Sequence, residues 1–487
     1  MSGELYLGLD VGTQSTKALL LDPDARTVVA RAASAYELLP GLPPGAAEQH
    51  PDTWWSAVET CLATLARSAD LARVRALGVS GQQHGFVALD AERRVLRPAK
   101  LWCDTSTAAE ARELTRTLGR HVPTGFTASK ILWLARHEPE RFARLAHVLL
   151  PHDWINFRLT GELAMEAGDA SGTALFDPAT RRFDARACYA IDARLESCLP
   201  RLVAPDEPIG TLTPDAARAL GLRTGIPVAP GGGDNMCAAI GAGATRAGIA
   251  VLSLGTSATV FAYARTPVLD PEGLIAPFCD STGGYLPLLC VMNATGVLNE
   301  VARGFGQDLA TLTRAAESVA PGSDGLLFLP DLAGERVPDL PEATGTLLGL
   351  RPGLLDAGHV FRAALEGVSL NLAWGVARLR ALGLALDSVR LVGGGARNEL
   401  WAGILADVLA VPVQRLAEDE SAALGAALQA AAVARGIPVD ELAQAHATPA
   451  GPPFAPRKGH AGVYGEASLR FRDAVDRLHA GRGRVET

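Results

Sequence analysis

The feature that most constrains the fold is a strand–turn–strand pattern that occurs twice. Near the N-terminus an apolar run, residues 5–9, ends on Asp10, turns at Gly12-Thr13 and continues as a second apolar run over residues 17–21. The stretch 252–261 repeats this order, with its turn at Gly255-Thr256. Short apolar runs joined by turn residues are typical of β-hairpins. Gly-Thr is common in such turns, so the two matches are a weak sign of duplication alone, but they are consistent with equivalent turns in two similar lobes.

The length of the chain also favours two lobes. At 487 residues it is too long for one hydrophobic core, and we predict domains over residues 1–245 and 246–487. With 48% hydrophobic and 20% charged residues the composition is that of a globular protein. The net charge of −8 argues against a nucleic acid or an anionic membrane as partner. The longest run of small apolar residues, 421–434, is shorter than the roughly 20 residues of a membrane span.

The cysteines indicate the compartment. The seven cysteines form no C-x-x-C pair, and their odd number does not suit a disulfide framework. The first residues carry no basic segment of the kind that begins a signal peptide. We therefore expect a cytoplasmic protein.

A triple-glycine turn is the first candidate for chemistry. Gly231 to Gly233 precede Asp234, and the small apolar residues 236–244 suit the start of a buried helix. The turn at 255–257 offers backbone N–H groups and hydroxyls. A carboxylate beside such an anion-binding nest is the pairing that phosphoryl transfer requires. The alternative is a glycine-rich interdomain loop with a helix-capping aspartate.

Further polar breaks interrupt apolar runs. Residues 81–85, Gly-Gln-Gln-His-Gly, separate two apolar strands, as a ligand loop would, although an ordinary surface histidine is the alternative. Gly393 to Gly395 follow a strand, with Asn398 near the next helix start, where phosphate or adenosine can lie against backbone. The break at 169–173 has no role that periodicity reveals. The helix that starts at Ser421 is rich in alanine and glycine, which allows close packing across a lobe interface.

The common nucleotide-binding motifs are absent. In a G-x-G-x-x-G reading the third glycine is replaced by Met236 or by Asn398, and no lysine follows a glycine as a P-loop requires. What remains is one Gly-Thr hairpin turn in each half and a Gly-Gly-Gly-Ala turn before a helix. With Asp10 directly ahead of the first turn, this ordered set strongly indicates a different phosphate-binding scheme.

That set resembles the FGGY carbohydrate kinases, the sugar kinase branch of the actin-like ATPase superfamily. The resembling motifs span nearly the whole chain, at residues 7–13, 81–85, 125–130, 231–235, 253–257, 334–336 and 393–398. The resemblance implies an α/β fold of two ribonuclease-H-like lobes around a central cleft. It places the sugar mainly on the first lobe and ATP mainly on the second.

The resemblance also implies roles for particular residues. Asp234 matches the general base, and Asp10 matches the carboxylate linked to Mg²⁺. The expected sugar contacts are Gln83, His84, Asp104 and Asn235. The expected ATP contacts are Gly12, Thr13, Gln14, Lys17, Gly255, Thr256, Ser257, Gly394, Gly395 and Asn398. The chain departs from the family pattern at Gln83, at residues 101–104 and at 119–125, all of which touch the sugar pocket, so the reaction type is better determined than the sugar.

The expected activity is ATP-dependent phosphorylation of a pentulose, D-xylulose, to its 5-phosphate. A sugar hydroxyl has a high pKa, so a carboxylate must accept its proton as the bond forms. Two alternatives remain: a kinase of the same fold for ribulose, fuculose, gluconate or glycerol, and a nucleotide-gated binding module like that of actin-like chaperone ATPases. The expected partners are a small sugar and ATP, without nucleic acid or membrane, and a homodimer is left open.

Overall fold

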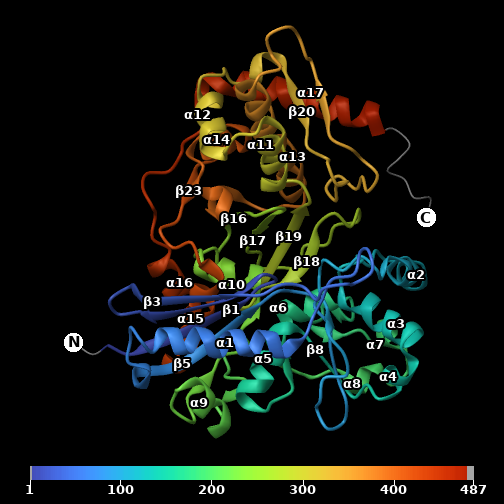
Figure 1. Cartoon of the computed structure of the whole chain (residues 1–487), viewed down its shortest axis with the longest axis vertical. Helices are drawn as coiled ribbons and strands as arrows, with labels where there is room; N and C mark the ends of the chain where they lie inside the picture. Colours follow the sequence, from blue (N-terminus) through green and yellow to red (C-terminus); the bar gives the residue numbers. More distant parts are fainter. Residues whose placement is uncertain (1–2, 480–487) are drawn as a thin grey trace.

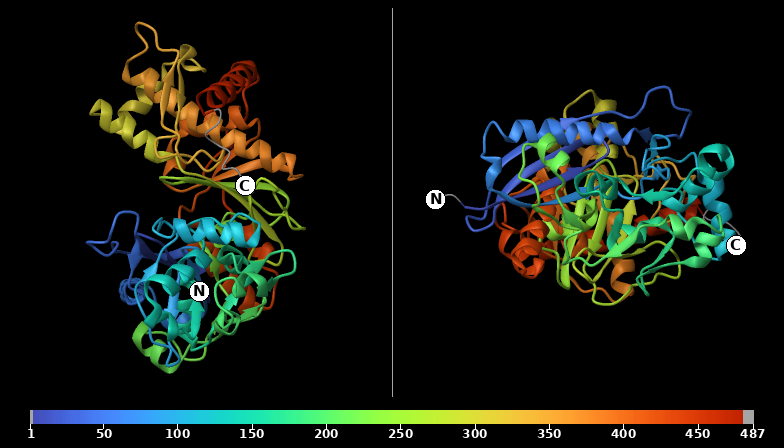
Figure 2. Two further views of the ribbon diagram at one scale, coloured as in Figure 1. Left: turned by 90° about the vertical axis from the view of Figure 1, so that its right-hand side faces the viewer. Right: turned by 90° about the horizontal axis from the view of Figure 1, so that it is seen from below.

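The computed structural model describes residues 3–479. Two lobes lie one above the other along the long axis of the molecule (Figure 1). Each lobe is built on a twisted sheet with its own hydrophobic core. Figure 2 shows the sheet of the second lobe on the side that faces the first lobe.

The first sheet has the strand order β13-β14-β5-β1-β2-β3, and β15 pairs with the end of β5. β1 pairs antiparallel with β2 and parallel with β5. The strands are β1 (Leu5–Val11), β2 (Ser15–Asp22), β3 (Thr27–Ala35), β5 (Val74–Gly81), β13 (Gly210–Thr211), β14 (Pro227–Val228) and β15 (Gly232–Gly233).

The second sheet has the order β18-β19-β17-β16-β22-β23. β16 pairs antiparallel with β17 and parallel with β22, as β1 does with β2 and β5. The strands are β16 (Gly248–Leu254), β17 (Ala258–Ala262), β18 (Ala276–Cys279), β19 (Tyr285–Val291), β22 (Leu386–Val392) and β23 (Val413–Arg415). Both sheets therefore have a hairpin, an antiparallel strand outside it and parallel strands on its other side. The prediction of two similar lobes is confirmed.

Helices and short strand pairs complete the first lobe. Apolar residues of the first helix, among them Trp55, Val58 and Leu62, are buried against the sheet. The helices that precede the second sheet are α1 (Pro51–Leu65), α2 (Ala108–Leu118), α3 (Thr127–His137), α4 (Pro139–Ala143), α5 (Pro151–Thr160), α6 (Ala167–Ala170), α7 (Ala185–Tyr189), α8 (Leu195–Cys198), α9 (Pro214–Leu220) and α10 (Asp234–Gly241). The short pairs are β4 (Glu48–Gln49) with β7 (Ala99–Lys100), β6 (Val87–Leu89) with β8 (His147–Leu149), β9 (Ala164–Glu166) with β12 (Arg201–Val203), and β10 (Phe176–Asp177) with β11 (Arg182–Phe183).

In the second lobe the long helix α13 (Ala357–Ala381) packs on the core of the sheet. Around it lie α11 (Thr295–Phe305), α12 (Leu309–Glu317), α14 (Glu399–Leu409), α17 (Ala461–His479) and the pair β20 (Leu327–Leu329) with β21 (Thr346–Leu348). No helix among residues 3–479 is long and apolar enough to cross a membrane. All seven cysteines are free thiols.

Helix α15 (Ser421–Arg435) comes late in the chain but packs on the first sheet, followed by α16 (Val439–His446). Backbones touch there: a Cβ on Gly8 would lie 1.9 Å from the Ala423 carbonyl oxygen, and one on Gly425 would lie 1.8 Å from the carbonyl oxygen of Cys237 in α10. Only glycine permits such an approach. The close packing predicted for this helix is confirmed, but it is made with the sheet and α10 of the first lobe rather than across a lobe interface. Residues 421–446 therefore lie with the first lobe although they follow the second sheet in sequence.

Candidate active site

The carboxyl ends of β1 and β5 lie side by side and carry the first site residue. Asp10 on β1 is in register with Ser80 on β5, whose Oγ donates to Asp10 Oδ1 at 2.8 Å. Burial raises the pKa of Asp10, and the hydrogen bond from Ser80 lessens that rise. A desolvated carboxylate is thus fixed just before the Gly12-Thr13 turn.

The triple-glycine turn delivers Asp234 to the same edge of the sheet. Gly231 has φ 77°, and a Cβ there would lie 2.1 Å from the Val79 carbonyl oxygen, so a side chain is excluded. Asp234 is the first residue of α10, and the residue at the helix-cap position is Gly233, which disfavours the alternative of a helix-capping aspartate. Burial, followed by the nearby charge of Asp10, raises the pKa of Asp234 to about 7.

The predicted sugar contacts Gln83 and Asn235 are joined to Asp234 by hydrogen bonds. Asn235 Nδ2 donates to Gln83 Oε1 and to Asp234 Oδ1, each at 2.8 Å. Its Oδ1 accepts from Thr259 Oγ1 on β17 at 3.0 Å. The structure therefore brings three predicted residues together and connects them to the second lobe.

His84 lies beside this chain of hydrogen bonds in a sparsely populated backbone conformation, with φ 63°. Its ring stacks on Phe126 with ring centroids 4.5 Å apart, and Phe278 is 5.7 Å away. Burial, followed by the charges of Lys130 and Arg336, lowers the pKa of His84 to about 3, so the imidazole is neutral. Its Nδ1 has no partner with normal hydrogen-bond geometry among the described residues, although the Gly172 backbone lies against it. A strained backbone at a residue enclosed by aromatic rings is typical of functional sites rather than of an ordinary surface histidine.

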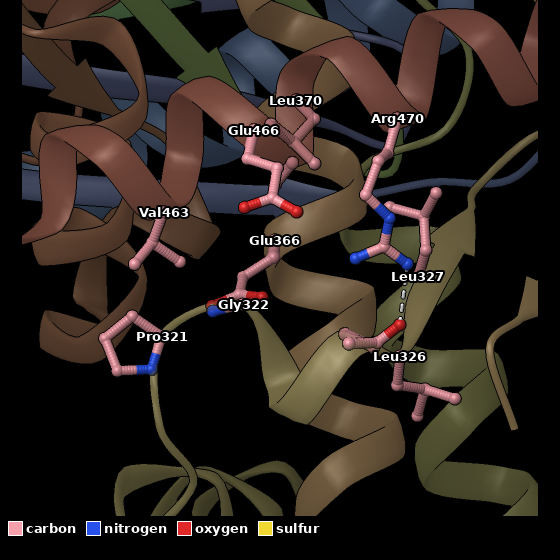
Figure 3. Close-up of a pocket in the computed structure, with 12 residues that line it drawn as sticks. Pro321, Gly322, Leu326, Leu327, Glu366, Leu370, Val463, Glu466 and Arg470 are labelled. Carbon is pink, nitrogen blue, oxygen red and sulfur yellow. Dashed lines mark hydrogen bonds between the residues drawn. The ribbon is translucent and has the colours of Figure 1, made fainter. Parts of the chain in front are cut away.

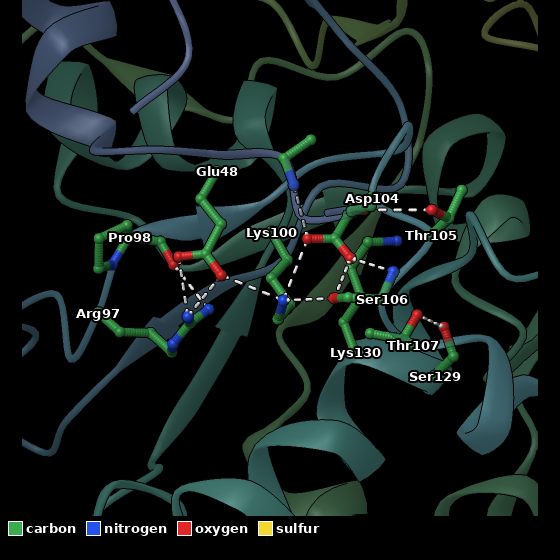
Figure 4. A network of polar contacts seen from close by, with 12 residues as sticks. Glu48, Arg97, Pro98, Lys100, Asp104, Thr105, Ser106, Thr107, Ser129 and Lys130 are labelled. Carbon is green, nitrogen blue, oxygen red and sulfur yellow. Dashed lines mark hydrogen bonds and ion pairs between the residues drawn. The ribbon is translucent and has the colours of Figure 1, made fainter. Parts of the chain in front are cut away.

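Asp104 lies in a separate polar network (Figure 4). Its Oδ2 accepts from Lys100 Nζ at 3.0 Å and from the Ala47 backbone N–H at 2.9 Å, and Oδ1 accepts from Ser106. Lys100 in turn pairs with Glu48 at 3.1 Å. The carboxylate is buried, and these bonds hold the segment that follows β7. The structure does not bring Asp104 into contact with Gln83, His84 or Asn235, and its part in sugar binding stays a prediction.

Each Gly-Thr turn is closed by a hydrogen bond that its glycine donates, although the bond spans three residues in the first turn and two in the second. Gly12 N donates to the Ser15 carbonyl and Gly255 N to the Ser257 carbonyl, both at 3.0 Å. Gly255 and Thr256 are exposed at the end of β16, and the glycine turn that follows β22 is beside them because these strands are parallel neighbours. Exposed N–H groups at adjacent strand ends can bind phosphate oxygens.

The glycines of the second turn differ in their surroundings. A Cβ on Gly395 would lie 2.8 Å from Leu254 Cβ and 2.9 Å from the Trp401 ring, whereas one on Gly394 meets nothing within 4 Å. Gly394 thus faces open space, where a ligand can approach, and Gly395 is required by packing. Asn398 caps α14 by accepting from the Trp401 backbone N–H at 3.0 Å.

The remaining predicted ATP contacts lie on the first hairpin. Lys17 Nζ pairs with Glu420 at 2.6 Å, immediately before α15, and is half-exposed. Thr13 Oγ1 donates to Gln82 at 3.1 Å and accepts from Trp102 Nε1 at 2.9 Å, while Gln14 is exposed. The nucleotide roles of these residues stay predictions.

A cavity of about 200 Å³ lies elsewhere, in the second lobe (Figure 3). Leu327, Leu370 and Arg470 are among its lining residues, and none of the predicted site residues lines it. Its buried acid, Glu366, already accepts from Gly322, Ser323, Arg362 and Tyr464. This cavity is therefore separate from the candidate site.

Sequence reasoning missed three residues of the site. Thr259 lies two positions beyond Ser257 on the same strand face, so the period of a β-strand could have found it. Phe126 belongs to a motif already singled out, but its stacking on His84 is a tertiary contact. Phe278 stands in a stretch without any motif, and nothing in the sequence indicates that it reaches His84.

Residues 5–241 match the N-terminal domain of the FGGY family of carbohydrate kinases, and residues 250–434 match the C-terminal domain of that family. The chain belongs to this family and is a sugar kinase, which uses ATP as a substrate. The alternative of a non-kinase binding module is not supported.

Similar proteins of known name indicate which members of the family the chain resembles. The chain is 38% identical to the xylulose kinase of Haemophilus influenzae over 444 residues, covering 88% of this chain and 90% of that one. It is 39% identical to the xylulose kinase of Streptomyces coelicolor over 469 residues, 92% of each. A crystal structure of a xyloylose kinase from Brucella ovis superposes with a TM-score of 0.91 at 34% identity, covering 98% of this chain and 100% of that one.

Proposed function

We propose that this protein transfers the γ-phosphoryl group of ATP to D-xylulose, giving D-xylulose 5-phosphate, with Asp234 as general base. One observation carries the assignment of the base: a carboxylate with a pKa raised to about 7 accepts a hydrogen bond from Asn235, which also bonds to Gln83, and both of these residues are expected to hold the sugar. The relatives named xylulose kinase support the choice of sugar.

The chemistry follows from the position of Asp234. A base works best when its pKa is near the working pH, and general-base catalysis contributes about 10²–10⁴-fold. Asp234 accepts the proton of the sugar 5-hydroxyl while that oxygen bonds to the γ-phosphorus. The bond between the γ-phosphorus and the β,γ-bridging oxygen breaks, and the electron pair leaves with ADP. Backbone N–H groups of the two Gly-Thr turns, other than those of Gly12 and Gly255 that are used within the turns, would bind the charged phosphate oxygens.

The side chains at the site are compatible with Mg²⁺, and the proposed reaction uses this ion. Proteins usually hold Mg²⁺ through one or two carboxylates together with waters and substrate phosphates. Among the described residues no group of three or more metal-ligating side chains is found. Asp10 is a desolvated carboxylate at the phosphate-binding turn and raises the pKa of Asp234, a repulsion that a cation would relieve. Asp10 would hold the ion, which when bound neutralises charge on the β- and γ-phosphates.

The test is a coupled ADP-release assay with D-xylulose, ribulose, fuculose, gluconate and glycerol. We expect turnover that requires sugar and Mg²⁺ and that is fastest with D-xylulose. A higher kcat/KM for another acceptor would overturn the choice of sugar but keep the reaction type. Turnover that no acceptor stimulates would overturn the reaction itself. The cytoplasmic location and the homodimer stay predictions.

A further inference from the structure

The polar segment 169–173 has no role in the reaction as described above. It nevertheless contacts the loop 81–85, which carries the predicted sugar contacts Gln83 and His84. A Cβ on Gly172 would lie 2.0 Å from His84 Nδ1, so this glycine touches the ring. The Ser171 hydroxyl accepts from the Cys279 backbone N–H at 3.0 Å, on β18 of the second lobe. The segment therefore sits between the predicted sugar contacts and the opposite lobe.

Asp169 is the charged residue of this segment and is fully buried. His152 Nδ1 lies 2.6 Å from Asp169 Oδ2, and His152 is fully buried too. Burial lowers the pKa of His152, but the carboxylates of Asp153, Asp169 and Glu166 outweigh it and raise the pKa to about 9. His152 and Asp169 therefore form a buried hydrogen-bonded pair, in which the raised pKa of His152 favours the protonated imidazole.

The Asp169 carboxyl also interacts with the Gln83 side chain. Burial raises the pKa of Asp169, while hydrogen bonding from His152 and from Gln83 opposes the rise. Asp169 Oδ1 and Gln83 Nε2 nonetheless lack a partner with normal hydrogen-bond geometry among the described residues. One is an acceptor and the other a donor. A small rotation or one bridging water would satisfy both, as buried polar groups require.

The two ends of the Gln83 amide therefore have different neighbours. Its Nε2 side faces the acceptor Asp169, and its Oε1 accepts from Asn235 Nδ2 at 2.8 Å. The oxygen and nitrogen of a glutamine amide have nearly the same shape, so neighbours decide which way it points. A reversed amide would place donor against donor and acceptor against acceptor.

We propose that the His152–Asp169 pair is a positioning device that fixes the orientation of the Gln83 amide and, through Asn235, aligns the Asp234 carboxylate for the sugar. This inference rests on the proposed function. With Nε2 directed toward Asp169 and Oε1 bonded to Asn235, the Gln83 amide has one favoured orientation, and Asn235 is in turn held against Asp234. Asp169 and His152 are positioning residues, because they act through Gln83 rather than on the substrate.

The main test is Asp169→Asn, which keeps shape but presents an NH₂ group to Gln83 Nε2. A misoriented buried amide leaves a polar group unsatisfied, so the KM for D-xylulose should rise roughly tenfold. The KM for ATP should stay unchanged because the nucleotide turns are untouched. The preference for D-xylulose over ribulose, measured as a kcat/KM ratio, should fall in parallel.

A second substitution provides a rescue. In the double variant Asp169→Asn with Gln83→Glu, the new carboxylate accepts from the amide introduced at position 169 on one side and from Asn235 on the other. The donor and acceptor pattern is restored with the same net charge, so the KM for D-xylulose should return toward that of the wild type. Gln83→Glu alone places two carboxylates face to face and should raise the KM. If Asp169→Asn alone does not fold, folding and activity of the double variant would carry the test.

The matched control is Asp153→Asn. Asp153 is equally buried, lies 3.2 Å from His152 Nε2, and accepts from the Leu150 backbone N–H at 2.9 Å at the start of α5. The substitution changes a carboxyl group that lies beside the same histidine to an amide of the same shape, at a position with no contact to Gln83 described above. We expect a lower melting temperature with an unchanged sugar KM and ketose ratio.

Two outcomes would overturn the inference: equal KM shifts in Asp169→Asn and Asp153→Asn, or no recovery in the double variant. Wild-type protein is assayed first on the acceptor panel, so a failure of the proposed function is seen separately. If the wild type prefers another sugar, the same comparison is made with that sugar.

Discussion

The neutral imidazole of His84 makes a quantitative prediction about stability and pH. The pKa of His84 is lowered to about 3, by burial first and then by Lys130 and Arg336, whereas an unfolded histidine titrates near about 6.5. Because the folded pKa is the lower one, the unfolded chain binds more protons between these values. The stabilising effect of a neutral His84 is therefore complete above about pH 6.5 and is lost as the pH falls toward 3. Integrated from pH 7 to pH 5, the loss is about 2 kcal/mol.

The perturbation is His84→Asn, since asparagine tolerates the positive φ of this position and does not titrate here. Urea unfolding followed by tryptophan fluorescence at pH 7, 6 and 5 gives the free energy of unfolding of both proteins. We expect the wild type to lose about 2 kcal/mol more than the variant between pH 7 and pH 5, because the other titrating groups are shared and cancel. Parallel losses in the two proteins would refute the reasoning and show that His84 accepts a proton in the folded state.

Three further predictions concern the base, the nucleotide turn and the glycine contacts. Asp234→Asn should lower kcat by about 10²–10⁴-fold with the KM for ATP unchanged, and a variant that keeps more than about a tenth of wild-type kcat would exclude the general base. Gly394→Val projects into open space, so it should raise the KM for ATP and spare the melting temperature and the sugar KM; a rise in sugar KM instead would remove this turn from the nucleotide site. Gly425→Ala should lower the free energy of unfolding by about 1–3 kcal/mol or more, because the new Cβ clashes with the Cys237 carbonyl. The matched control Gly462→Ala has nothing within 4 Å of the new Cβ, so thermal or chemical unfolding should show no change or a gain of up to about 1 kcal/mol.

Local patterns predicted the parts of the site that depend on backbone. The glycines before Asp234 and the two Gly-Thr turns could be identified because close backbone approach and tight turns need particular residues at fixed spacing. The repeated hairpin predicted two similar sheets for the same reason. These signals lie within a few neighbouring residues.

Contacts between distant segments could not be predicted in this way. Whether Asp104 faces the sugar or pairs with Lys100 depends on how the segment after β7 folds back on β4, which no local pattern encodes. The contact between the rings of Phe278 and His84 joins the two lobes, and no pattern in either stretch of sequence indicates it. Burial, which sets the pKa values of His84 and Asp234, is likewise a property of the assembled lobes.

The position of α15 has a consequence for synthesis of the chain. A ribosome releases the strands of the first sheet long before it reaches residues 421–435, so Tyr6, Leu19 and Ala76 lack their covering helix until the chain is almost finished. The N-terminal half then exposes an apolar face during translation, a situation in which chaperones are needed and aggregation competes with folding. A fragment ending at residue 245 should accordingly be insoluble by itself and be recovered by co-expression with the remaining half.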